Sequence, residues 1–101
     1  MKITSLSKAV KSPFKLEAFV MHSSSTTELI HLILEPSQCV DLHSNPFDVV
    51  ACLIFGKATL NLEGMNHQLN CYDVVELEKD TLRGFTNNGN NEARLLILKK
   101  F

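Results

Sequence analysis

The chain has no tryptophan, one tyrosine and almost equal numbers of acidic and basic residues. Its ten basic and eleven acidic residues leave a formal net charge of −1, so no long-range field attracts nucleic acid or an anionic membrane. It has no apolar run near the roughly 20 residues that a membrane-spanning helix needs. The opening stretch MKITSLSKAV lacks the apolar core of a signal peptide. We therefore expect neither nucleic acid nor a membrane as a partner, and a cytoplasmic location.

The cysteines form no recognisable framework. There are three, Cys39, Cys52 and Cys71, and no two of them have the CxxC spacing. A secreted chain this short usually carries an even number of cysteines joined as disulfides. An odd number without metal or redox spacing predicts reduced, partly buried thiols.

Helical periodicity is missing as well. No segment keeps a helical period for more than two turns; instead, short segments of alternating or fully apolar residues are separated by turn residues. The predicted strands are residues 14–20, 27–36, 39–45, 47–56, 57–64, 72–78 and 93–100. Many short strands at short spacing predict an all-β fold, an antiparallel sandwich or barrel. The length fits one domain, residues 1–101.

Two short motifs stand in order along the chain. The first runs from a turn at Pro36 through the pair His43-x-Asn45 to Gly56, and the second runs from Cys71-Tyr72-Asp73 to the stretch RGFTN, residues 83–87. This order resembles the small single-domain cupins, whose conserved barrel is also called the RmlC-like jelly roll. The resemblance covers about residues 27–100. It implies an antiparallel jelly-roll barrel, preceded by an N-terminal extension, residues 1–26, that holds one strand.

The resemblance also implies where a metal would bind. In metal-binding cupins the ligands are two histidines, a glutamate and a later histidine, and these positions fall on His43, Asn45, Val49 and Arg83. Only His43 is a good ligand, because an amide oxygen is poor, valine cannot ligate and a guanidinium stays protonated. A fixed cation at Arg83 would also repel a divalent ion. We therefore predict a barrel without metal or other cofactor.

The replaced ligand positions still form a candidate binding site. Because side chains alternate along a strand, residues two apart share a face, so Asp41 and Asn45 should accompany His43 into the barrel. The candidate ligand-binding residues are His43, Asn45, Arg83, Asp41, Val49 and Phe85. Apolar walls with a few polar groups are typical of small-molecule sites. Since arginine offers a planar fork of donors to carboxylate or phosphate, we expect a small polar or anionic ligand.

The same residues allow other functions. A histidine can donate, accept or transfer a proton, so His43 is the candidate acid/base of a metal-independent isomerase or epimerase. Tyr72 and Asp41 are the nearest candidates for its partner. A metal-dependent dioxygenase is a further alternative. Purely structural roles also stay open, with Arg83 turned outward to a carboxylate and Asn45 forming only a turn. Whether the chain is an enzyme is left open.

The resemblance predicts a homodimer too, because small cupins commonly pair through their sheets. The predicted N-terminal strand offers one apolar face for such a contact, formed by Phe14, Leu16, Ala18 and Val20. The expected partners are thus a small ligand and a second copy of the chain.

Overall fold

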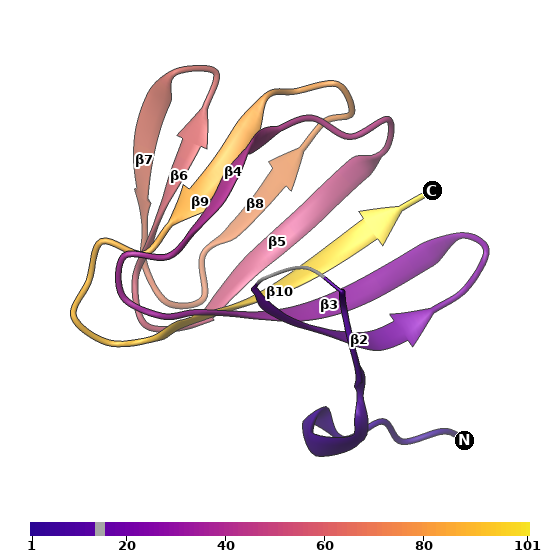
Figure 1. The fold of residues 1–101 in the computed structure, drawn as a ribbon. Helices are drawn as coiled ribbons and strands as arrows, with labels where there is room; N and C mark the ends of the chain where they lie inside the picture. The colour runs from indigo at the N-terminus through magenta and orange to yellow at the C-terminus, as the bar shows by residue number, and fades with distance from the viewer. Residues whose placement is uncertain (14–15) are drawn as a thin grey trace.

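The computed structural model describes residues 1–13 and 16–101 and consists mainly of short strands (Figure 1). They are preceded by one short 3-10 helix, η1 (Leu6–Lys8). The strands are β1 (Val10–Lys11), β2 (Glu17–Ser23), β3 (Thr27–Leu34), β4 (Cys39–His43), β5 (Asp48–Phe55), β6 (Ala58–Leu62), β7 (Met65–Leu69), β8 (Val74–Leu77), β9 (Arg83–Thr86) and β10 (Ala93–Lys100). Among the described residues, no helix has the length and apolar character needed to cross a membrane.

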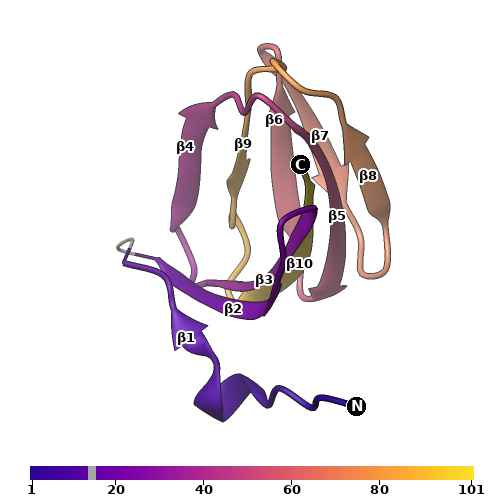
Figure 2. The same cartoon turned by 90° about the vertical axis from the view of Figure 1, so that its right-hand side faces the viewer.

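The strands form two antiparallel sheets that face each other. One sheet has six strands in the order β1-β2-β3-β10-β5-β8, and the other has four in the order β4-β9-β6-β7. The two views in Figures 1 and 2 show these sheets curving around a common interior, with β1 and the N-terminus extending away from it. The predicted all-β jelly-roll architecture is confirmed.

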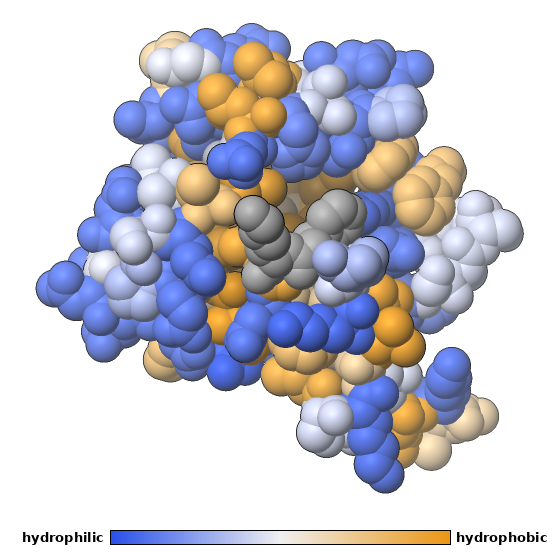
Figure 3. Space-filling model, in the orientation of Figure 1, coloured by the Kyte–Doolittle hydropathy of each residue, from blue (hydrophilic) through white to orange (hydrophobic). Residues whose placement is uncertain are grey.

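The interior is filled from both sheets. Leu34, Leu53 and Leu95 of the six-stranded sheet are fully buried, and Leu60 and Phe85 of the four-stranded sheet complete the same apolar cluster. The space-filling view in Figure 3 shows apolar surface between the two sheets, framed by hydrophilic side chains. The core therefore forms from alternate residues of facing strands, as the alternation in the sequence predicts.

The N-terminal extension contains two strands, where the sequence predicted one. The predicted strand 14–20 lies partly outside the described residues, at Phe14 and Lys15; its remainder belongs to β2, which pairs with β1 through Val10 and Val20. Ala18 is buried in the core and Val20 packs against it. This face is therefore turned inward and is not free for the dimer contact that the sequence suggested.

Tyr72 stands in a strained turn between β7 and β8. Its φ of 74° is in the left-handed region, which costs a residue with a Cβ about 1–2 kcal/mol. Its side chain is 78% exposed, so little packing offsets that cost, while its backbone N–H donates to the Leu53 carbonyl at 2.6 Å. This backbone hydrogen bond holds Tyr72 in its left-handed conformation.

We expect the substitution Tyr72→Gly to raise the free energy of unfolding by about 0.5–1 kcal/mol, because the relief of strain exceeds glycine's extra unfolded-state entropy. Urea denaturation followed by circular dichroism measures the change. Tyr72→Ala is the control: it removes the same exposed ring but keeps the Cβ, so it should give no gain. Equal stability of the two variants would contradict the assignment of strain.

Candidate functional site

Arg83 begins β9 and is buried inside the barrel. Its residue is 2% exposed, and Phe85, two positions later on the same face, is 5% exposed. The neighbouring positions across the sheet are His43 of β4 and Leu62 of β6. The predicted inward position of Arg83 and Phe85 agrees with this geometry, and an outward arginine paired with a surface carboxylate does not.

The guanidinium of Arg83 contacts only neutral acceptors. Nη1 donates to the Thr81 carbonyl at 3.1 Å. With its amide oxygen turned toward the arginine, Asn45 accepts from Nη2 at 2.8 Å, and its Nδ2 then donates to the Ser44 carbonyl at 3.3 Å. Across residues 1–13 and 16–101, no carboxylate lies within 4.0 Å of this guanidinium. Burial lowers the pKa of Arg83 below its usual value, since a charged group is disfavoured away from water.

His43 reaches the same face of the sheet through a bulge in β4. Val40 pairs with Phe85, and His43 pairs with Arg83, so three steps on β4 correspond to two on β9. The extra residue reverses the alternation after Val40. His43 is exposed, and its Nδ1 lies 2.8 Å from the Asp41 carbonyl oxygen. If Nδ1 donates there, Nε2 is the free acceptor of the neutral ring.

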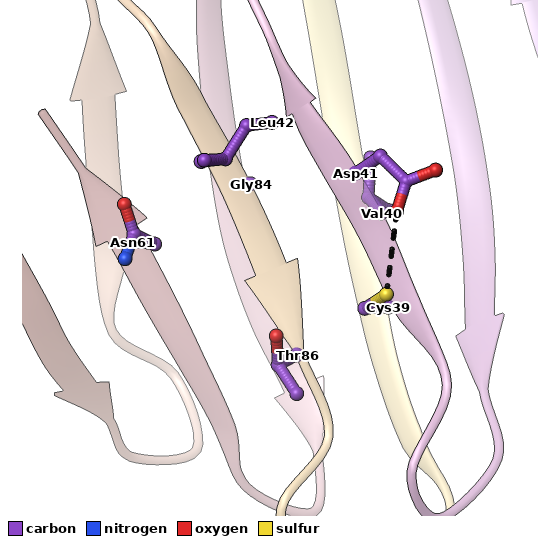
Figure 4. A pocket seen from close by; sticks show the side chains of 7 residues that line it. All are labelled: Cys39, Val40, Asp41, Leu42, Asn61, Gly84 and Thr86. Carbon is purple, nitrogen blue, oxygen red and sulfur yellow. Dashed lines mark hydrogen bonds between the residues drawn. The ribbon is translucent and has the colours of Figure 1, made fainter. Parts of the chain in front are cut away.

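The bulge places Asp41 on the other side of the sheet. Asp41 and Gly84 both line a shallow hollow of about 210 Å³. The Asp41 carboxylate accepts a hydrogen bond from the Cys39 thiol at 3.6 Å (Figure 4). This hydrogen bond raises the pKa of Cys39. The sequence grouped Asp41 with His43 on one face, and that grouping is wrong because it assumed unbroken alternation.

Gly84 allows the bulge to lie close to β9. A Cβ on Gly84 would stand 2.6 Å from the Val40 carbonyl oxygen, closer than a carbon atom can approach. The backbone of β4 therefore crosses β9 at a point where only glycine fits. The absence of a side chain at Gly84 thus allows the close approach of β4, the strand that carries His43, to β9.

The six-stranded sheet supplies the apolar wall of the site. Val49 of β5 is 3% exposed and belongs to the core, and it pairs with Lys99 of β10. Just before β5, Phe47 packs against the core and meets Phe101 edge-on, with ring centroids 5.0 Å apart. Phe47 was not among the predicted site residues, although it begins the predicted strand 47–56 and lies two positions before Val49, on the same face of that strand.

The other candidate catalytic groups do not join His43. His22 and His67 are exposed. His31 stands 3.4 Å from the Arg94 guanidinium; burial, with Arg94 second, lowers the pKa of its ring. The backbone N–H of Tyr72 donates to the carbonyl of Leu53. Leu53 lies near the end of β5, whereas Val49 lies near its start. In the part of the chain that the structure describes, the imidazole ring of His43 has a backbone carbonyl as its only hydrogen-bond partner.

Solved structures with the same architecture identify the fold. A cupin 2 conserved barrel domain protein from Salinispora arenicola matches with a TM-score of 0.85, covering 100% of this chain and 89% of its own, at 16% identity. A predicted oxalate decarboxylase from Thermotoga maritima matches with a TM-score of 0.89, covering 99% of both chains, at 14% identity. The chain has the cupin fold.

Cupins that resemble this chain have varied activities. The polyketide cyclase RemF from Streptomyces resistomycificus matches with a TM-score of 0.88, covering 99% of this chain and 79% of its own, at 12% identity. At such identities the likeness shows the fold alone. No protein-family model matches the sequence, and no curated protein matches it either. The function has to be argued from the residues in the barrel.

The cupin metal positions of this chain do not fit a metal. They hold an imidazole, an amide, an alkyl group and a guanidinium, at His43, Asn45, Val49 and Arg83. The Asn45 oxygen already accepts from Arg83, so the amide faces a cation rather than a vacant ligand position. Among the described residues, no group of three or more His, Cys, Asp or Glu side chains could hold a metal ion. These four side chains therefore offer a metal ion one good ligand, the imidazole of His43.

Proposed function

We propose that this cupin binds a small anion, a carboxylate or a phosphate, at Arg83 in the barrel. The supporting observation is the buried guanidinium, whose described acceptors are one backbone carbonyl and one amide oxygen. Most of its N–H donors remain unused, and a buried charge without a counter-charge is costly. An anion would supply both the acceptors and the opposite charge.

The residues around Arg83 fit this role. Asn45 orients the guanidinium, and Val49 and Phe85 form an apolar wall that strengthens electrostatic attraction by excluding water. His43 lies beside Arg83 on the neighbouring strand and is exposed, so the ligand approaches past the imidazole. When protonated, that ring would add a second positive group to the site.

A second candidate function is proton transfer by His43. The hydrogen bond from Nδ1 to the Asp41 carbonyl would fix the ring and leave Nε2 facing the ligand as a base. A metal-independent isomerase or epimerase uses such a group on a bound acid. Binding is the function we favour, because Arg83 accounts for it alone, whereas catalysis needs a second proton-transfer group beside His43.

The test of binding is isothermal titration calorimetry with a panel of small carboxylates and inorganic phosphate, chosen after thermal-shift screening. A ligand at 100 times its Kd should raise the free energy of unfolding by about 2.7 kcal/mol. The substitution Arg83→Gln should weaken binding by about 1.5–3 kcal/mol, the worth of a hydrogen bond to a charged group. His43→Gln should weaken binding less than Arg83→Gln does.

Arg94→Gln is the matched control. Arg94 is a half-exposed arginine of β10 whose guanidinium pairs with Glu92 at 3.2 Å, so its loss should leave the affinity unchanged. Circular dichroism confirms that each variant is folded before titration. If Arg83→Gln binds every ligand of the panel as tightly as the wild type does, the proposed site is wrong.

A further inference from the structure

An ion pair stands on the inner face of the six-stranded sheet. Lys99 of β10 pairs in register with Glu28 of β3 on one side and with Val49 of β5 on the other. Val49 belongs to the core, and residues directly opposite each other in antiparallel strands lie on the same face of a sheet. Lys99 and Glu28 therefore point into the barrel. Their side chains meet there, with Nζ of Lys99 donating to Oε1 of Glu28 at 3.3 Å.

This ion pair lies at the same end of the barrel as Arg83. The connection from β4 to β5 consists of residues 44–47, so the end of β4 that holds His43 is next to the end of β5 that holds Val49. His43 pairs with Arg83, and Val49 pairs with Lys99. The two walls of the barrel thus carry their charged inner residues at one mouth.

The strands that hold Arg83 and Lys99 lie across the interior from each other. The sheet orders β3-β10-β5-β8 and β4-β9-β6-β7 match position by position, because β3 continues into β4, β9 into β10, β5 into β6 and β7 into β8. The longest of these four connections is residues 87–92, so β10 lies opposite β9 (Figure 2). Stacked sheets are about 10 Å apart. A ligand that touches both walls is therefore only a few atoms long.

The ion pair offers a hydrogen-bond donor and an acceptor side by side. An ammonium group has three donors, and Lys99 uses one of them on Glu28. Oε2 of Glu28 has the Ser23 hydroxyl at 3.5 Å, which is too long for a strong hydrogen bond. The Lys99 and Glu28 side chains are 29% and 24% exposed, so a ligand can reach them from solvent. A hydroxyl group, which both donates and accepts, matches this pair, whereas Glu28 would repel a second carboxylate.

We propose that the ion pair of Lys99 and Glu28 is the second recognition point of the anion site, and that the ligand is a small hydroxy acid. Its carboxylate binds Arg83, while its hydroxyl donates to Glu28 and accepts from Lys99. The inference rests on the proposed function, since Arg83 has to hold the carboxylate. It adds the chemical class of the ligand and two residues that determine specificity.

Isothermal titration calorimetry with four-carbon acids provides the test. Butyrate has no hydroxyl, and the three hydroxybutyrates carry one on the second, third or fourth carbon. We expect at least one hydroxybutyrate to bind the wild-type chain about tenfold or more tightly than butyrate, the effect of one hydrogen bond to a charged group. Hydroxybutyrates that bind no more tightly than butyrate would overturn the inference and leave the anion site standing. If none of the four acids binds, the anion site itself is wrong and the inference fails with it.

A double substitution, Glu28→Met with Lys99→Met, tests whether the ion pair causes this preference. Replacing both partners leaves neither charge unpaired, a change that folded proteins often tolerate. The ratio of the butyrate Kd to the hydroxybutyrate Kd should fall to about one, because the partners of the hydroxyl are gone. If the double variant does not fold, Lys99→Met alone should lower the same ratio.

The matched control is Glu92→Met with Arg94→Met. These residues form an ion pair of similar length, 3.2 Å, with side chains 29% exposed at Arg94 and 32% exposed at Glu92. Its loss should keep the wild-type ratio of the two dissociation constants. Circular dichroism confirms that each variant is folded before titration. A wild-type ratio in the folded variant that lacks Lys99 and Glu28 would overturn their assignment, and so would an equal fall of the ratio in the control.

Discussion

Replacing Leu95 by alanine should lower the free energy of unfolding by about 2–5 kcal/mol, the range for a leucine truncated in a packed core. Leu95 of β10 is 0% exposed and lies in the central strand row between Leu32 and Leu53, both of them core residues. Neighbours on both sides hold the backbone, so the site cannot collapse around the missing atoms. Urea denaturation measures the loss. The slope of the unfolding free energy against urea concentration is compared between the variants.

Leu82→Ala is the control for this truncation. Leu82 precedes β9 and is 46% exposed, so the same removal of atoms should cost well under 1 kcal/mol, as is usual for surface substitutions. A loss at Leu95 no greater than the loss at Leu82 would mean that the β10 row is not the centre of the core. It would also call into question the pairing of β10 with β3 and β5.

A comparable loss is expected at Asn87, the end of the RGFTN stretch. Its side chain is fully buried, and Nδ2 donates to the Leu34 carbonyl at 2.9 Å and to the Asn91 carbonyl at 2.8 Å, while Oδ1 accepts from the Gly89 N–H at 2.9 Å. Asn87→Asp keeps the shape but turns a carboxylate oxygen toward two carbonyls. Leaving a buried charge unpaired costs about 3–5 kcal/mol.

This substitution also has a predicted dependence on pH. Burial and the two carbonyls favour the protonated acid, so the pKa of the new carboxyl is raised in the folded state. A raised folded-state pKa means that the folded protein holds the proton more tightly than the unfolded chain, so the deficit relative to the wild type should shrink as pH falls. Asn88→Asp, at the exposed neighbour, is the control and should show neither the loss nor its pH dependence. A deficit at Asn87 that is constant between pH 4 and pH 8 would contradict the burial of this side chain.

Most of the fold could be predicted from the sequence because the core strands are marked by their apolar residues and by the turn residues between them. The segments predicted at 27–36, 47–56 and 93–100 correspond to β3, β5 and β10, whose apolar residues have the spacing of strands. β7 was missed, since four of its five residues are exposed and an exposed edge strand shows no alternation. Both faces of these strands carry apolar residues, so the sequence could not say which of the two faces is inside.

The candidate site was less predictable because its geometry depends on distant strands. Arg83, Phe85 and Val49 follow regular alternation, and the structure buries all three residues. His43 and Asn45 both lie near Arg83, as the sequence predicted. Asn45, however, belongs to the turn after β4 and not to a strand, and its amide contacts the guanidinium from that turn. Asp41 was misplaced because nothing in the sequence marks a bulge except Gly84, which lies more than forty residues further along.

The bulge in β4 has a consequence for how relatives of this chain can be recognised. Deleting either Asp41 or Leu42 would restore a regular strand with His43 still opposite Arg83, because the pairing on either side of the bulge is already in register. A one-residue gap at this point would therefore leave the strand pairing on both sides unchanged. Motif searches that count residues between the first turn and the histidine will then misalign homologous chains by one position. Matching by strand pairing avoids that error, because the residue pairs on either side of the bulge keep their register.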